Sequence, residues 1–89
     1  MKQVHLLISG FVQGIGYRSW VRSRARSLGL TGWINNLENG SVETVFQGEE
    51  EKIKEMIKLC KEGPPMAEVE NIEIQWDQIN GEFKDFQVR

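Results

Sequence analysis

Hydrophobic residues occupy every second position in several short stretches of the chain. In the first of them, Val4, Leu6 and Ile8 alternate with His5, Leu7 and Ser9, which is typical of a strand with one buried face. The same reasoning predicts strands at 30–36 (LTGWINN), 42–47 (VETVFQ) and 69–77 (VENIEIQWD), and a short last strand within 83–89 (FKDFQVR). Asn39-Gly40 between the second and third stretches is a strong hairpin signal.

Two other segments follow the helical period. The spacing of Tyr17, Val21, Ala25 and Leu28 predicts a helix over about 17–28, which Gly29 would end. A second helix is predicted within 49–63, where acidic residues come first, lysines come later, and Gly63-Pro64-Pro65 stops the helix. Its apolar stripe consists of Ile53, Met56, Ile57 and Cys60.

The resulting order is β-α-β-β-α-β with a small extra strand at the C-terminal end. This order is typical of the ferredoxin-like α+β sandwich, in which two helices cover one face of an antiparallel sheet. We expect a single domain over 1–89. Because a strand-helix-strand crossover returns parallel to the first strand, the loop after the first strand and the end of the second should lie at the same edge of the sheet.

Composition excludes several classes of protein. With 39% hydrophobic and 27% charged residues, the 89-residue chain resembles an ordinary soluble globule, without a membrane span. Its net charge of -2 argues against a broad nucleic-acid surface. The single cysteine allows neither a disulfide framework nor a cysteine-based metal site, and we expect no cofactor. The apolar N-terminal stretch is too short for a secretory signal, which favours the cytoplasm.

The glycine loop SGFVQGIGYR is the strongest candidate for chemistry. A dinucleotide-binding loop is disfavoured because Ser19 replaces the third glycine, and no Gly-Lys-Ser/Thr of a Walker-type loop follows. Gly14 and Gly16 at a strand-to-helix junction allow successive backbone N–H groups to surround one anion, and Arg18 adds a fixed charge. A plain turn with a solvated arginine remains the alternative.

The segments GFVQGIGYR and GWINN together resemble the two signature segments of the acylphosphatase family, and the resemblance extends over the whole chain. Ile15, Tyr17 and Ile34 are mild departures from the family pattern. The resemblance implies an enzyme that hydrolyses the carboxyl-phosphate bond of small acyl phosphates without a metal ion, and we expect it to be a monomer. It also implies that Arg18 and Asn36 are the essential pair.

These implied roles agree with the chemistry of the residues. The backbone N–H groups of the loop and the Arg18 side chain would hold the phosphate; the loop residues are Gln13, Gly14, Ile15, Gly16, Tyr17 and Arg18. The Asn36 amide would hold the attacking water. An asparagine at a strand end before a turn is also common without any catalytic role, but Asn36 shares a strand face with Ile34 and would point towards the loop.

Other candidate residues are assigned structural roles. His5 is expected on the outer face of the first strand, Cys60 as a buried, inert thiol, and Trp20 and Trp76 as core residues. Arg18, Arg22 and Arg26 are spaced in one row along the first helix. Such a row is usually a solvated face, although it could steer an anionic substrate.

Two other functions share either the element order or the pocket. An RNA-recognition domain has the same element order, but VETVFQG lacks its basic and aromatic motif, and Glu43, Glu70 and Glu73 make the open sheet face acidic or mixed. The same pocket could also work inside a larger maturation enzyme that uses carbamoyl phosphate. The end of the chain just after the last strand favours a free-standing protein.

Overall fold

The computed structural model describes residues 1–89 and contains the predicted elements in the predicted order. The strands and helices are β1 (Lys2–Phe11), α1 (Tyr17–Ser27), β2 (Thr31–Asn36), β3 (Val42–Gly48), α2 (Glu50–Glu62), β4 (Glu68–Asp77) and β5 (Phe86–Val88). Strand β1 is longer at both ends than its alternation pattern indicated. Neither helix is long and apolar enough to cross a membrane.

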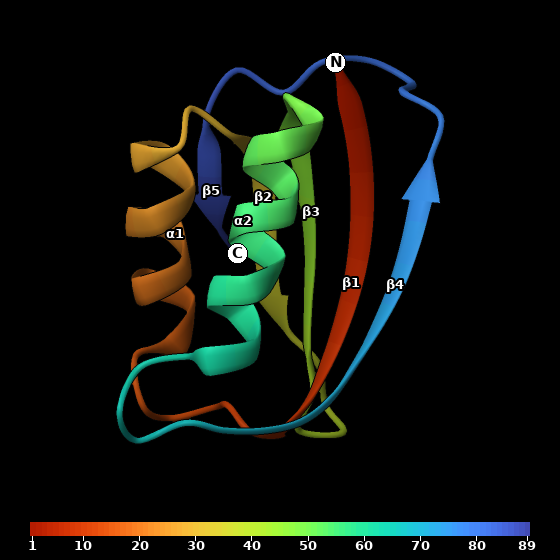
Figure 1. Ribbon diagram of the computed structural model, residues 1–89. Coiled ribbons are helices and arrows are strands. Elements are labelled where there is room, and N and C mark those ends of the chain that lie inside the picture. Colours follow the sequence, from red (N-terminus) through yellow and green to blue (C-terminus); the bar gives the residue numbers. More distant parts are fainter.

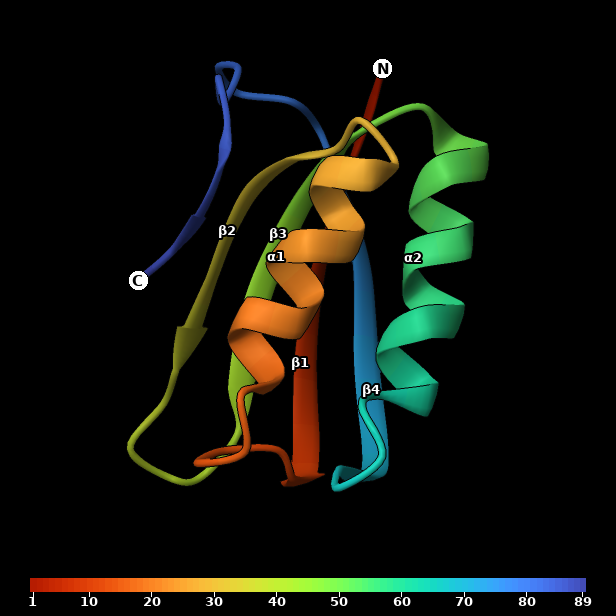
Figure 2. The ribbon, with the colours of Figure 1, turned by 90° about the vertical axis from the view of Figure 1, so that its left-hand side faces the viewer.

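The strands form one sheet in the order β4-β1-β3-β2-β5, and both helices lie on the same face of it (Figures 1 and 2). The ferredoxin-like α+β fold is therefore confirmed, with β3 between β1 and β2. The sheet is mixed, however, because β5 pairs with β2 in parallel. The connection 78–85 crosses one end of the sheet, from the edge strand β4 to the opposite edge (Figure 1). Strand β5 therefore starts at the end of the sheet at which β4 finishes, and it runs antiparallel to β4. Strand β2 has this same direction.

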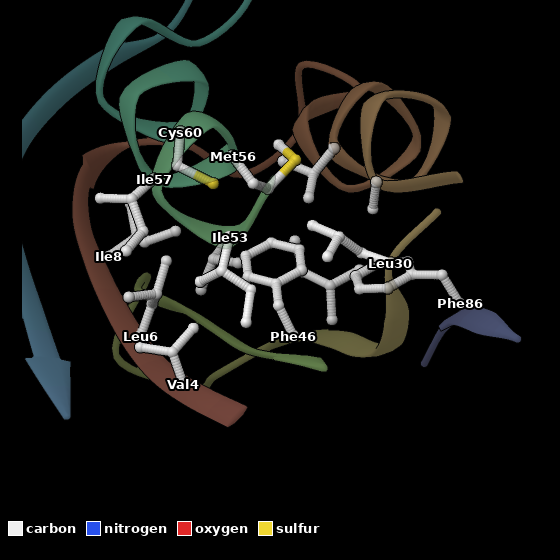
Figure 3. Close-up of a cluster of buried hydrophobic side chains, with 14 of the residues drawn as sticks. Val4, Leu6, Ile8, Leu30, Phe46, Ile53, Met56, Ile57, Cys60 and Phe86 are labelled. Carbon is white, nitrogen blue, oxygen red and sulfur yellow. The ribbon is translucent and has the colours of Figure 1, made fainter. Parts of the chain in front are cut away.

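Both helices bury their apolar stripes against the sheet. Figure 3 shows the core between the two layers, with Val4, Leu6 and Ile8 of β1 facing the α2 residues Ile53, Met56, Ile57 and Cys60. The Phe46 ring of β3 stacks on that of Phe86 of β5, with ring centroids 5.4 Å apart. This contact ties the short last strand into the main core.

The end of α1 follows the sequence signal closely. Gly29 has a φ of 72° and donates to the Arg26 carbonyl, while the Leu30 N–H donates to the Ala25 carbonyl. These two bonds form a Schellman cap, which only a residue tolerant of positive φ allows without strain.

The core prediction for Trp76 is wrong. Trp76 pairs with the fully buried Val4 and therefore lies on the helix-covered face, but 44% of its surface is exposed. Strand β4 is an edge strand of the sheet, and Trp76 borders an open surface groove there together with Glu50 and Lys54 of α2. Trp20 is half-buried and packs against the core as predicted.

Candidate active site

A small cavity of about 110 Å³ lies where the loop after β1, the start of α1, the end of β2 and strand β5 meet. Nine residues line it: Val12, Gln13, Gly14, Gly16, Tyr17, Arg18, Ser19, Asn36 and Val88. Its size suits a phosphoryl group and little more. The glycine loop and the end of β2, which the sequence predicted to meet at one end of the sheet, thus line the same cavity.

Two glycines shape the loop of this cavity. Gly14 has a φ of 77° and Gly16, which caps the N-terminus of α1, a φ of 78°. A side chain at either position would meet no neighbouring atom within 4 Å. The glycines are therefore required by backbone conformation, because other residues rarely adopt these angles. The left-handed turns bring the loop into the helix N-terminus, where unpaired N–H groups favour an anion.

Arg18 lies in the first turn of α1 and its guanidinium is held by the C-terminal strand region. Its Nη1 donates a 2.7 Å hydrogen bond to the backbone oxygen of Arg89. The Arg89 N–H in turn donates to the Ile34 carbonyl, and its guanidinium stacks over the Trp33 ring at 4.7 Å. One donor of Arg18 is thus used for orientation, and its remaining N–H groups can serve an anion.

Asn36 is the last residue of β2. It pairs with the buried Val42 and shares the helix-covered face with Ile34. Its Oδ1 is buried and has no hydrogen-bond partner. A buried polar atom without a partner is costly, and Asn36 as a residue also lines the cavity, so its amide is a candidate for contact with a ligand or water.

The cavity contains most of the predicted site residues. Ile15 does not line it, since its side chain packs against the core. Sequence reasoning missed Val12, Ser19 and Val88. Ser19 follows Arg18 in the first helical turn and could have been found from that position, whereas Val88 depends on the pairing of β5 with β2.

No aspartate, glutamate, histidine, cysteine or lysine lines the cavity. Tyr17 is its one titratable side chain besides Arg18, and burial raises the pKa of this phenol far above its usual range. The Tyr17 hydroxyl donates instead to the Cys60 carbonyl. An acid or base that titrates near neutral pH is therefore missing from the cavity wall.

The remaining candidates are distant from this chemistry. His5 alternates with the core residues of β1, so it lies on the open sheet face, where its Nε2 is 2.7 Å from Glu43 Oε2. Cys60 is fully buried, and desolvation raises the pKa of its thiol to about 12. No three His, Cys, Asp or Glu side chains are grouped so that they could hold a metal ion.

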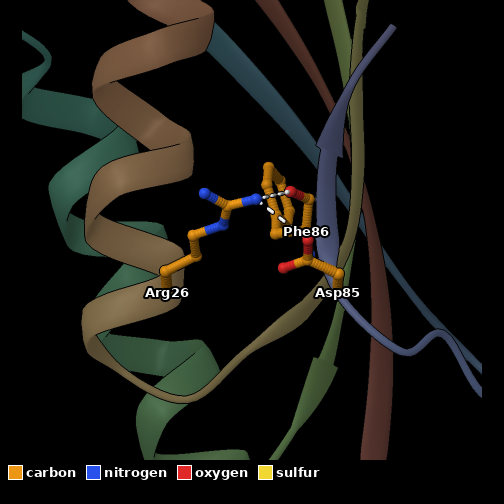
Figure 4. A network of polar contacts seen from close by, with 3 residues as sticks. All are labelled: Arg26, Asp85 and Phe86. Carbon is orange, nitrogen blue, oxygen red and sulfur yellow. Dashed lines mark hydrogen bonds and ion pairs between the residues drawn. The ribbon is translucent and has the colours of Figure 1, made fainter.

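The basic row of α1 is partly used within the fold. Figure 4 shows Arg26 reaching Asp85, with 2.9 Å from Nη2 to Oδ2, and the Phe86 carbonyl at 3.3 Å. The Phe86 N–H and Arg26 hold the pKa of Asp85 below its ordinary value. Arg26 therefore connects β5 to α1. Of the row, only Arg18 and Arg22 remain as candidates for steering an anionic substrate.

Comparison with known proteins agrees with this geometry. The sequence pattern of the family described as Acylphosphatase matches residues 4–88. An acylphosphatase from Caldanaerobacter subterraneus subsp. tengcongensis is 49% identical over 98% of this chain and 97% of its own length. The crystal structure of acylphosphatase from Bacillus subtilis superposes with a TM-score of 0.97 at 28% identity, covering 100% of this chain and 99% of that one.

A second kind of match involves a much larger protein. The crystal structure of T. kodakarensis HypF superposes on 100% of this chain with a TM-score of 0.88 and 33% identity. The matched region is 12% of the HypF chain. The same fold thus also occurs as a small part of a longer protein.

Proposed function

The chain belongs to the acylphosphatase family, and on that premise we propose that it hydrolyses acyl phosphates to a carboxylate and inorganic phosphate, with Arg18 holding the phosphate and Asn36 the attacking water. The observation that carries the assignment of roles is the shared cavity. Arg18, Asn36 and the glycine loop line one concavity, and no Asp, Glu, His, Cys or Lys is among its lining residues.

Such a cavity suits this bond in particular. A carboxylate leaving group has a conjugate acid with a pKa of about 4, so it departs at neutral pH without a general acid. Phosphoryl transfer then requires mainly charge stabilisation and positioning. A reaction that expelled an alkoxide would need a proton donor, and the cavity wall offers none.

The phosphate-binding role is assigned to Arg18 and the loop backbone. The left-handed angles of Gly14 and Gly16 and the start of α1 support N–H donation from residues 13–18 towards one anion. The Arg18 guanidinium, oriented by the Arg89 oxygen, supplies the positive charge and further donors. Together they would neutralise the phosphoryl oxygens as charge spreads over them in the transition state.

The water-positioning role is assigned to the Asn36 amide. The position of Asn36 in the cavity wall, facing the glycine loop, supports this role. An amide is too weak a base to remove the proton of this water. The proton therefore goes to a phosphate oxygen of the substrate, and the hydroxyl oxygen forms its bond to phosphorus as the P–O bond to the carboxylate breaks.

The proposal also includes a setting for the enzyme. We propose a monomer that acts in the cytoplasm on small molecules and needs neither a metal ion nor a nucleic acid. The relative from Caldanaerobacter, named an acylphosphatase, is 49% identical, whereas the matched region of HypF is 33% identical, which supports the acylphosphatase reaction over the carbamoyl phosphate alternative.

The test is phosphate release from an aryl acyl phosphate, with and without a chelator, by the unmodified protein, Arg18→Gln and Asn36→Ala. We expect turnover that the chelator does not change and losses of at least about 100-fold in both folded variants. Turnover that depends on a metal ion, or a variant as active as the parent, would contradict the assigned roles.

A further inference from the structure

The side chain of Gln13 joins the two halves of the candidate site. Gln13 lines the cavity in the loop after β1, yet its Nε2 donates to backbone oxygens of the turn after β2. The acceptors are the carbonyls of Leu37 and Ser41, each at 2.8 Å. Both N–H groups of the amide are therefore used, and they connect the loop after β1 with the turn between β2 and β3.

The two acceptors are the ends of the turn that follows Asn36. Leu37 is the next residue after Asn36, and its own N–H donates to the Ser41 carbonyl at 2.9 Å. The Ser41 N–H is in turn bonded to Asn39 Oδ1. Gln13 thus holds a small hydrogen-bonded turn through the carbonyls of its first and last residues, Leu37 and Ser41. A shift of Gln13 would therefore shift the end of β2.

The position of Asn36 depends on these two Gln13 bonds, because the Asn36 side chain makes no hydrogen bond of its own. Its Oδ1 makes no hydrogen bond, and its neighbour in the ladder is Val42. The orientation of the amide is then set by the backbone at the strand end. The pairing of β2 with β3 ends at Asn36, and the next residue, Leu37, is held by Gln13.

We propose that Gln13 is a positioning residue that fixes the separation between the phosphate-binding loop and Asn36. The inference rests on the proposed function. Gln13 contributes its backbone N–H to the phosphate loop and its side chain to the opposite wall. Loss of the side-chain bonds moves Asn36 relative to a bound phosphate while the loop keeps its own conformation through Gly14 and Gly16.

The test replaces Gln13 by methionine, which has a similar shape and no donor. The matched control is Gln47→Met, because the Gln47 amide also joins separate segments. It bonds to Gln3 Oε1 and, in the remote connection 78–85, to the Gly81 carbonyl and the Phe83 N–H. Since displacement of a catalytic group by about 1 Å can cost 100-fold in rate, we expect Gln13→Met to lower kcat at least about 10-fold. The inhibition constant of inorganic phosphate should stay within about threefold. In Gln47→Met, kcat should stay within about twofold.

A double variant separates positioning from general damage. If Gln13 acts through Asn36, Gln13→Met should cost less than about twofold in kcat when Asn36 is already alanine. An equal loss in both backgrounds, an unchanged kcat in Gln13→Met, or a phosphate inhibition constant that rises as far as kcat falls would each overturn the proposal.

A readout without turnover keeps this proposal distinct from the proposed function. Hydrogen exchange of the Leu37 amide should quicken in Gln13→Met and stay unchanged in Gln47→Met, because this amide closes the gripped turn. Should Gln13→Met not fold, Gln13→Asn, which keeps the amide but is one methylene too short, is measured in the same way. An inactive parent protein would refute the proposed function. Unaltered exchange of the Leu37 amide in Gln13→Met would refute the claim that the Gln13 side chain holds this turn.

Discussion

The Tyr17 hydroxyl donates a buried 2.8 Å hydrogen bond to the carbonyl oxygen of Cys60, and so ties the first turn of α1 to the last turns of α2. Four residues after Cys60 comes Pro64, which has no N–H to complete the helical bond to that carbonyl. Tyr17 therefore supplies a donor that the α2 backbone lacks.

Replacement of Tyr17 by phenylalanine should destabilise the fold. The variant keeps the ring but leaves the buried Cys60 carbonyl without a partner, which costs about 1–2 kcal/mol in the free energy of unfolding. Urea unfolding of both proteins measures this difference. An unchanged midpoint at equal slope would show that water or another donor already satisfies the carbonyl.

The contact between Arg26 and Asp85 should make stability depend on pH. The folded-state pKa of Asp85 lies below its ordinary value of 3.8, because the Phe86 N–H and Arg26 favour the carboxylate. Its stabilising contribution is therefore present above the ordinary pKa and is lost as pH falls through the lower, folded-state pKa.

Asp85→Asn should accordingly be less stable than the parent at pH 7. The difference between the two urea midpoints should begin to shrink below about pH 4 and vanish at lower pH. Arg26→Gln is the matched variant, since it removes the other partner (Figure 4). A midpoint difference that does not change with pH would exclude this carboxylate as its source.

Asn36→Ala should separate activity from stability. Removal of a buried oxygen without a partner relieves a cost, so the free energy of unfolding should stay the same or rise by up to about 1 kcal/mol. Turnover should nevertheless fall at least about 100-fold. Asn35→Ala, one position away on the opposite strand face, is the control and should keep its kcat. A marked loss of stability in Asn36→Ala would point to a structural role instead.

His5→Asn should leave both turnover and its pH dependence unchanged. The imidazole lies on the open face of the sheet beside Glu43, away from the helix-covered face that leads to the cavity. Initial rates from pH 5 to 9 would check this. A change in the shape of the profile would mean that His5 influences the reaction after all.

The fold was predictable because its elements carry strong local signals. The alternation around Val4, the helical stripe around Ile53 and the turn at Asn39-Gly40 each fix one element, and the right-handed crossover then brings the glycine loop and Asn36 to one edge. Strand parity then places Asn36 on the helix-covered face, beside the loop.

Other features depend on packing that no local pattern encodes. Trp76 has core parity, but on an edge strand its burial depends on how far α2 overlaps that strand. Val88 lines the cavity only because β5 pairs in parallel with β2. Gln13 was expected to contribute only its backbone N–H group. Its side chain instead bonds to a turn 24 and 28 positions away.

The division of labour between Arg18 and Asn36 is the central claim, and competitive inhibition by inorganic phosphate tests it most directly. Asn36→Ala should retain an inhibition constant within about threefold of the parent while its turnover is lost, because the phosphate contacts remain. Arg18→Gln should raise that constant at least about 10-fold. If Asn36→Ala lost phosphate affinity as fully as Arg18→Gln, Asn36 would be a phosphate ligand and the assigned roles would be wrong.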